Sequence, residues 1–163
     1  MTTTETSYPF PDGEDNELKK IFNIDLREYS KEQKDAAAAS WSEFCRNQLD
    51  AQMFVKLIAI CEGSLAEATV LYDALWFHRK YGLKKFQERS AIYFINKYGK
   101  DFFVERTLRR GMQQLGESGL LVHWPVSTGF SRKFRIDWIE LSDRLILVSK
   151  KLPGLTTYEG DEA

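Results

Sequence analysis

Apolar residues recur at helical spacing from residue 30 onwards. Ser30 and Gln33 form a capping box, and Trp41 and Phe44 fall on one stripe of the segment that follows. The pattern predicts a helix from residue 30 to about residue 49. Segment 18–22 carries a short helical signal, and the polar residues before it predict a mobile arm.

The apolar run 53–61, interrupted by Lys56, fits either a buried strand or another helix, because periodicity does not separate the two. The next segment is clearer. Ser64 and Glu67 form a second capping box before a helix over 65–81, which Gly82 ends. That helix is apolar nearly all round, as a central helix is.

Two further helices are predicted downstream, over 86–98 and 102–117. Gly99 ends the first of them, and Asp101 is a suitable N-cap for the second. Gly119 follows as a C-terminal stop signal.

After Gly119 the pattern changes to that of strands. Segments 120–124 and 130–138 flank a turn at 127–129, and the second segment alternates Phe134, Ile136 and Trp138 with polar residues. These features predict a β-hairpin. An amphipathic helix over 139–150 follows, and a Pro-Gly pair ends it.

The predicted class is mainly α with a small β-hairpin, an α+β protein. We expect five parts: a mobile arm (1–17), an N-terminal helical extension (18–62), a central domain (63–141), a C-terminal helix (142–155) and an acidic tail (156–163). No apolar run approaches the roughly 18 residues that cross a bilayer, and the N-terminus lacks a signal pattern. We therefore expect a cytoplasmic protein without membrane contact.

Charge is distributed unevenly along the chain. The formal net charge is −1, but residues 1–78 carry 7 basic and 14 acidic side chains, whereas residues 79–135 carry 13 basic and 4 acidic ones. The central segment therefore has a charge of +9. Because binding responds to the local field of a surface, this segment favours a polyanionic partner.

The segment 106–122 reads RTLRRGMQQLGESGLLV. It resembles the recognition helix and first wing strand of winged helix-turn-helix proteins, most closely those of phage and plasmid replication or regulatory proteins. The matching positions are Thr107, Leu108, Met112, Leu115, Ser118, Gly119, Leu120 and Leu121. The likeness extends over about 63–141. It implies a winged-helix core with extra N-terminal helices and a C-terminal helix, and a DNA-binding function.

A helical wheel gives an independent reason to consider DNA. Val104, Gly111, Met112 and Leu115 lie within about 60° of Leu108 and form the predicted buried stripe. The opposite face, at about 100° to 200°, carries Arg106, Arg109, Arg110 and Gln113. Arginine and glutamine are residues that pair with bases in the major groove. The alternative is an ordinary solvated face, although such faces usually mix both signs of charge.

The hairpin and the turn before the recognition helix supply further candidate DNA contacts. Arg132, Lys133 and Arg135 lie just past the hairpin tip, where they could reach phosphates or serve only as a charged sheet edge. Lys97 and Lys100, before the predicted recognition helix, are candidate phosphate contacts.

Three features depart from the resemblance. Phe102 and Phe103 stand where small or polar residues are common, and Glu105 would repel phosphate. Gly111 inside the helix costs about 1 kcal/mol against alanine, so we expect it to let a neighbouring helix approach closely.

The sequence offers no enzymatic signature. It lacks a glycine-rich phosphate loop, and His78 and His123 are each best explained as structural residues. Cys45 and Cys61 are expected to be reduced thiols in apolar surroundings. No metal or other cofactor is expected.

We therefore expect a sequence-specific double-stranded DNA-binding protein, either a transcription regulator or a replication-associated factor, located at the nucleoid if bacterial. The alternative is a winged helix that serves as a protein-interaction module in a larger assembly. Two apolar faces are candidates for a homodimer or partner contact. One carries Trp41 and Phe44, and the other carries Leu141, Leu145 and Val148.

Overall fold

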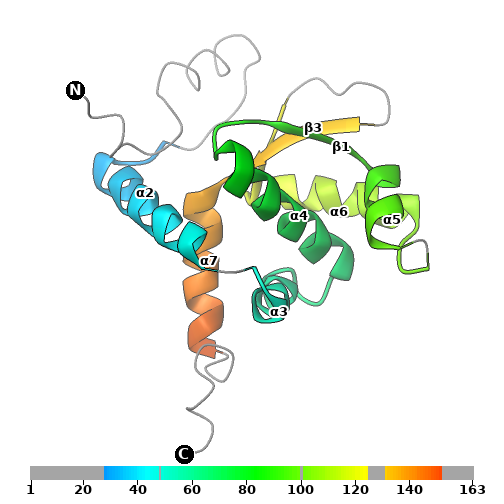
Figure 1. Ribbon diagram of the computed structural model, residues 1–163, viewed down its shortest axis with the longest axis horizontal. Coiled ribbons are helices and arrows are strands. Elements are labelled where there is room, and N and C mark those ends of the chain that lie inside the picture. Colours follow the sequence, from blue (N-terminus) through cyan, green and yellow to red (C-terminus); the bar gives the residue numbers. More distant parts are fainter. Residues whose placement is uncertain (1–27, 48, 100, 125–130, 152–163) are drawn as a thin grey trace, which may run out of the picture.

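The computed structural model describes residues 28–47, 49–99, 101–124 and 131–151. In these ranges six helices accompany one three-stranded antiparallel sheet (Figure 1). The helices are α2 (Lys31–Arg46), α3 (Ala51–Ile60), α4 (Leu65–Tyr81), α5 (Ala91–Tyr98), α6 (Glu105–Glu117) and α7 (Trp138–Lys151). The strands are β1 (Gln87–Ser90), β2 (Leu121–His123) and β3 (Ser131–Ile136). The mainly helical α+β class is confirmed.

Polar N-caps set where four of the helices begin. The side chains of Ser30, Asp50, Ser64 and Ser90 each accept a hydrogen bond from the backbone N–H three residues later. The two capping boxes in the sequence predicted the starts of α2, at Ser30, and α4, at Ser64. Asp50 decides the ambiguous apolar run in favour of a helix, α3, because its cap orients the first turn.

Strand β1 was not expected, because the sequence pattern predicted a single helix over residues 86–98. Gln87–Ser90 instead pairs antiparallel with β3, with Gln87 opposite Phe134 and Ser90 opposite Ser131. The sheet order is β1-β3-β2, so β3 is the central strand. Local sequence could not reveal this strand, because its hydrogen-bonding partner lies more than 40 residues downstream.

Helix α4 is the centre of the core, as its apolar composition predicted. Val70, Leu71 and Leu75 are fully buried, and the helix packs against α3, α6 and β3. In Figure 1 the sheet lies along one side of α4, with α5 and α6 beside it. The fully buried Phe94 of α5 and Phe134 of β3 belong to the same core.

Part of the two apolar faces considered for partner contact packs within the chain. Trp41 and Phe44 of α2 lie 4.9 Å and 5.0 Å, centroid to centroid, from the ring of Trp138 in α7. The Trp138 indole also donates to the Ser40 hydroxyl at 2.9 Å. Leu141 of α7 is fully buried. These side chains therefore complete the chain's own core. Within the ranges described, no helix combines the length and apolarity that a membrane span requires.

Candidate nucleic-acid interface

Helix α6 has one buried and one exposed side, divided as the helical wheel predicted. Leu108, Met112 and Leu115 are fully buried, whereas Arg106, Arg110 and Gln113 are exposed and Arg109 is half-buried. The buried side packs against α4. A rigid core contact therefore holds the four polar side chains on one strip of surface (these four are called the α6 face below).

Gly111 explains how closely α4 and α6 approach. A Cβ atom placed there would lie 3.3 Å from Cγ of Glu67 and 3.6 Å from its backbone nitrogen. The first distance is tighter than most van der Waals contacts, and the second is an ordinary one. The expectation that Gly111 admits a neighbouring helix is confirmed.

The start of α6 differs from the sequence prediction. The helix begins at Glu105 with Val104 as N-cap, and no side chain caps it. Asp101 is not the cap, because residues before the helix form a turn in which the Phe102 N–H donates to the Gly99 carbonyl. Phe102 and Val104 are consequently 74% and 62% exposed, and Val104 is not part of the buried stripe.

Two carboxylates lie beside the α6 face. Glu105 accepts from Arg109 at 2.9 Å, and Glu117 accepts from Gln113 at 3.1 Å. Exposed pairs of this spacing contribute only about 0.2–0.5 kcal/mol, so a ligand could displace them at small cost. They also make the surface less purely basic than the four positions alone suggested.

The hairpin residues divide into exposed and buried ones. Lys133 is exposed, with its Nζ 4.9 Å from the Trp124 ring, and Arg132 is half-buried. Arg135 is only 1% exposed, and its guanidinium lies 4.9 Å from the Phe86 ring. The expected outward placement of Arg135 is therefore wrong. The reason is that the Phe86 ring, which precedes β1, covers the guanidinium of Arg135, whereas Lys133 two residues earlier on β3 stays exposed.

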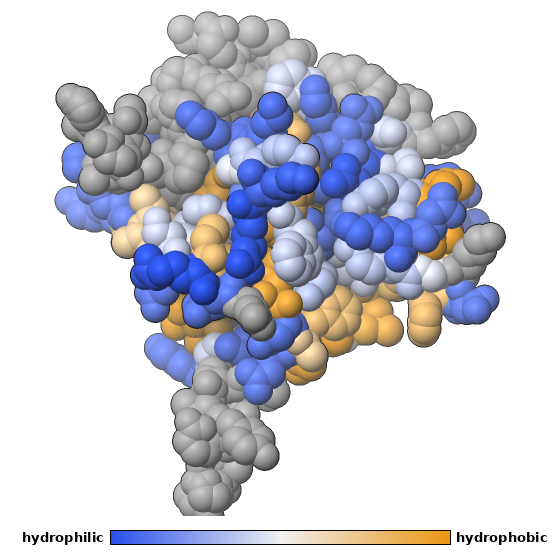
Figure 2. Space-filling model, viewed as in Figure 1, coloured by the Kyte–Doolittle hydropathy of each residue, from blue (hydrophilic) through white to orange (hydrophobic). Residues whose placement is uncertain are grey.

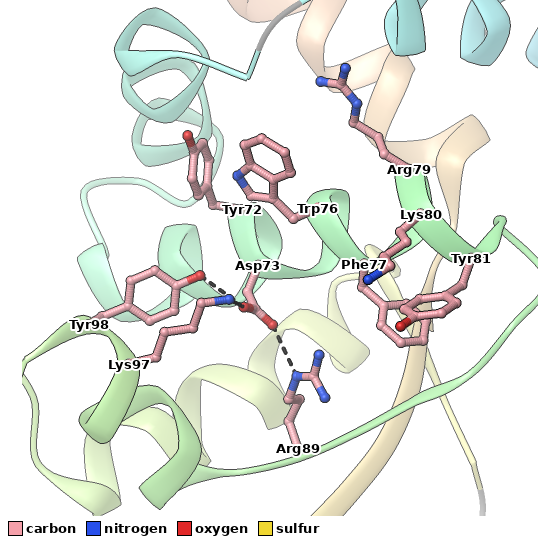
Figure 3. A pocket seen from close by; sticks show the side chains of 10 residues that line it. All are labelled: Tyr72, Asp73, Trp76, Phe77, Arg79, Lys80, Tyr81, Arg89, Lys97 and Tyr98. Atoms are coloured by element: carbon pink, nitrogen blue, oxygen red, sulfur yellow. Dashed lines mark hydrogen bonds and ion pairs between the residues drawn. The ribbon is translucent and has the colours of Figure 1, made fainter.

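Lys97 is held by a carboxylate that the sequence reading had not singled out. Asp73 of α4, 1% exposed, accepts from Lys97 Nζ at 3.0 Å and from Arg89 Nε at 3.1 Å. The hydroxyls of Tyr93 and Tyr98 donate to it at 2.8 Å and 2.9 Å, and Gln87 Nε2 donates at 3.3 Å. Figure 3 shows Lys97, Tyr98 and Arg89 converging on Asp73.

The fold favours the ionised form of the Asp73 carboxylate. Burial alone would raise the pKa of Asp73, but hydrogen bonds from Lys97, the two tyrosines and Arg89 outweigh it and lower the pKa. One sequence signal could have revealed the cluster: an acid in the apolar middle of a helix needs buried hydrogen-bond donors. Lys97 is thus a bridge between α4 and α5, and Lys100 lies outside the described residues.

Both histidines have structural roles in the fold. His78 Nε2 accepts from the Ile136 N–H at 3.1 Å, so Nδ1 carries the hydrogen and donates to the Gly82 carbonyl at 2.8 Å. Burial lowers the pKa of His78 to about 4. His123 is hydrogen-bonded through Nε2 to the Met112 carbonyl at 2.9 Å. The His78 ring therefore joins α4 to β3 and to the residue that ends α4, and the His123 ring joins β2 to α6.

The thiols agree with the expectation that they are reduced. Cys45 and Cys61 are both free. Burial raises the pKa of Cys61 to about 12, which keeps this thiol protonated. Among the residues that the structure describes, no three histidine, cysteine or acidic side chains come together as a metal site would need.

A separate pocket of about 690 Å³ opens beside Asp73. Figure 3 shows aromatic and basic side chains of α4, β1 and α5 around it. In the view of Figure 2, hydrophilic side chains cover much of the described surface, and hydrophobic ones gather below them. The lining residues are Tyr72, Asp73, Trp76, Phe77, Arg79, Lys80, Tyr81, Arg89, Lys97 and Tyr98.

Comparisons of the chain with protein-family models, with curated proteins and with solved structures each found no match.

Proposed function

We propose that this chain binds double-stranded DNA in a sequence-specific manner, as a transcription regulator or a replication-associated factor. In this proposal residues 63–141 form a winged-helix domain, and α6 enters the major groove. The order of α4, α5, α6 and the β2–β3 hairpin supports it, because this is the order that the sequence resemblance implies.

The α6 face carries the proposal. Its side chains project from a helix of 13 residues, which is about 20 Å long and fits the major groove. Leu108, Met112 and Leu115 anchor the opposite side of α6 in the core. The helix itself therefore holds Arg106 and Arg110 on the protein surface, where they can contact DNA. Arginine pairs bidentately with guanine, and glutamine with adenine.

The hairpin adds contacts of a different kind. Lys133 and Arg132 stand on β3, and both are accessible enough to approach a phosphate. Phosphate contacts position a protein on the duplex without specifying its sequence. Buried Arg135 is left out of this role, and Lys97 would have to share its ammonium group with Asp73.

The test is duplex binding, followed by fluorescence anisotropy, with a site selected from random DNA. Arg106→Ala and Arg110→Ala should each cost about 1–3 kcal/mol of binding and relax preference at one position. Both should leave unfolding free energy within about 0.5 kcal/mol of wild type. Lys150→Ala, an exposed lysine on α7, is the matched control and should bind as wild type does.

Salt dependence provides a second measurement. If Arg132 and Lys133 neutralise two phosphates, log affinity should fall against log salt with a slope of about −2. Affinity that is flat between about 50 and 200 mM salt, or wild-type binding by both arginine variants, would contradict the proposal.

A protein-interaction role is the second candidate, favoured by one observation. Phe102 and Val104 are 74% and 62% exposed in the turn that leads into α6. Exposed apolar groups beside a basic strip suit an acidic protein surface. In that case no duplex binds at low salt, and polyglutamate, a probe for such a surface, binds in a manner that depends on Phe102 and Arg106.

A further inference from the structure

The pocket beside Asp73 exposes aromatic rings that the core does not use. Trp76 is 48% exposed and Tyr81 is 53% exposed, and both line the pocket. Figure 3 shows Trp76 next to Tyr72 on one side and Tyr81 next to Phe77 on the other. Large rings left open to solvent in a concave site are available to stack against a planar ligand.

Positive charge surrounds these rings. Arg79 extends towards α2 in Figure 3, where its Nη2 donates to the neutral Cys45 carbonyl at 3.0 Å, so it keeps its positive charge. The other three cations, Lys80, Arg89 and Lys97, face a single carboxylate, Asp73. The four cations and one carboxylate of the lining give a formal charge of +3, which favours a ligand such as a phosphate monoester with a charge of about −1.5 to −2.

The cations are also held in place before any ligand arrives. Arg89 is bonded to Asp73 and lies 4.3 Å from the Tyr93 ring, and Lys97 is bonded to both Asp73 and the Tyr93 hydroxyl. Side chains fixed in this way lose little conformational entropy on binding. Asp73 therefore fixes the positions of Arg89 and Lys97 on the side of the pocket that would contact the ligand.

From this combination we infer a second site that binds a nucleotide, with its base stacked on Trp76 or Tyr81 and its phosphate near Lys80, Arg89 and Lys97. A volume of about 690 Å³ lies within the usual range of ligand pockets. Stacking together with cationic contacts is how proteins hold unpaired nucleotides. The described lining residues belong to α4, β1 and α5, so this site is separate from α6 and does not depend on the proposed duplex binding.

Two sources share this chemistry, a free nucleotide and an unpaired nucleotide in a single strand. The probes are therefore adenosine monophosphate, titrated by calorimetry, and a 5′-phosphorylated oligothymidylate of about ten residues, followed by anisotropy. Binding of the monophosphate identifies the free nucleotide as the source. Binding of the oligonucleotide alone identifies the single strand, and either result supports the site.

Variants test where the probe binds. Trp76→Ala and Lys80→Glu should each weaken binding about tenfold or more, which is what the loss of one stacked base or one phosphate contact produces. Ile92→Ala, at the same 48% exposure but outside the pocket, and Lys150→Glu on α7 are the matched controls and should bind normally. Thermal denaturation by circular dichroism checks that each variant is folded.

Three results would overturn the inference. Neither probe binds at about 1 mM; or Trp76→Ala and Tyr81→Ala both leave both affinities unchanged; or Lys150→Glu weakens binding as much as Lys80→Glu does, which indicates a general charge effect. Should Trp76→Ala fail to fold, Tyr81→Ala replaces it, because Tyr81 is 53% exposed. Arg106→Ala should leave nucleotide affinity unchanged, which separates this site from the α6 face.

Discussion

Replacing Asp73 by asparagine should destabilise the fold with almost no change of shape. The Asp73 carboxylate receives five hydrogen bonds, three at Oδ1 and two at Oδ2, and two of the donors are the cations Arg89 and Lys97. Asparagine keeps one acceptor oxygen. Its NH₂ group then faces Arg89, which can only donate, and the cluster loses its negative charge.

The magnitude follows from the partners. A hydrogen bond to a charged group contributes about 1.5–3 kcal/mol, and the exposure of Arg89 and Lys97, at 22% and 48%, places both near the lower end. The tyrosines can keep the remaining oxygen. Gln87 can turn its amide so that its oxygen accepts from the new NH₂ group, so we assign it no loss. The expected cost is about 3 kcal/mol, or a fall in Tm of about 6–12 °C for a chain of this length.

The assay is urea and thermal denaturation at pH 7, with Asp35→Asn as the matched control. Asp35 is an exposed acid paired with Lys31 on α2, and its substitution should cost less than about 0.5 kcal/mol. Because the fold lowers the pKa of Asp73, its contribution is present above about pH 4 and is lost as the pH falls further. The difference in unfolding free energy between wild type and Asp73→Asn should therefore become smaller below about pH 4. An Asp73→Asn protein as stable as wild type at pH 7 would refute the reasoning.

Three further predictions concern His78, Gly116 and Lys133. The fold lowers the pKa of His78 to about 4, so the unfolded chain takes up this proton first as the pH falls below about 6.5. Stability should drop by about 2–3 kcal/mol more in wild type than in His78→Gln between about pH 7 and 4.5, and equal pH slopes would argue against it. Gly116→Ala should destabilise by about 1–3 kcal/mol although alanine favours helices, because the new Cβ would lie 2.8 Å from Nε2 of His123. Urea denaturation measures this, and the double variant with His123→Ala should recover stability. Lys133→Ala should weaken duplex binding equally for all sequences and lower the salt slope by about one; a loss confined to one sequence would show that it contacts a base.

The sequence alone determined most of the helices and the two-sided character of α6. Ser30 and Ser64 indicate where helices begin, because a capping hydrogen bond joins residues only three positions apart and can be predicted from the local sequence. The buried stripe through Leu108, Met112 and Leu115 follows from the 3.6-residue period, which is also a local property. The close approach at Gly111 was predicted for the same reason, since an interior glycine needs a packing explanation.

Only the tertiary structure decided the parts that depend on distant partners. Gln87–Ser90 became a strand because β3 supplies its hydrogen bonds. Phe86, just before that strand, then covers Arg135, which alternation had placed outside. The pocket formed because Asp73 gathered donors from β1 and α5, up to 25 residues away along the chain. Periodicity reports which side of an element is apolar. It does not report which other element will cover that side, because the covering contacts are made between residues far apart in sequence.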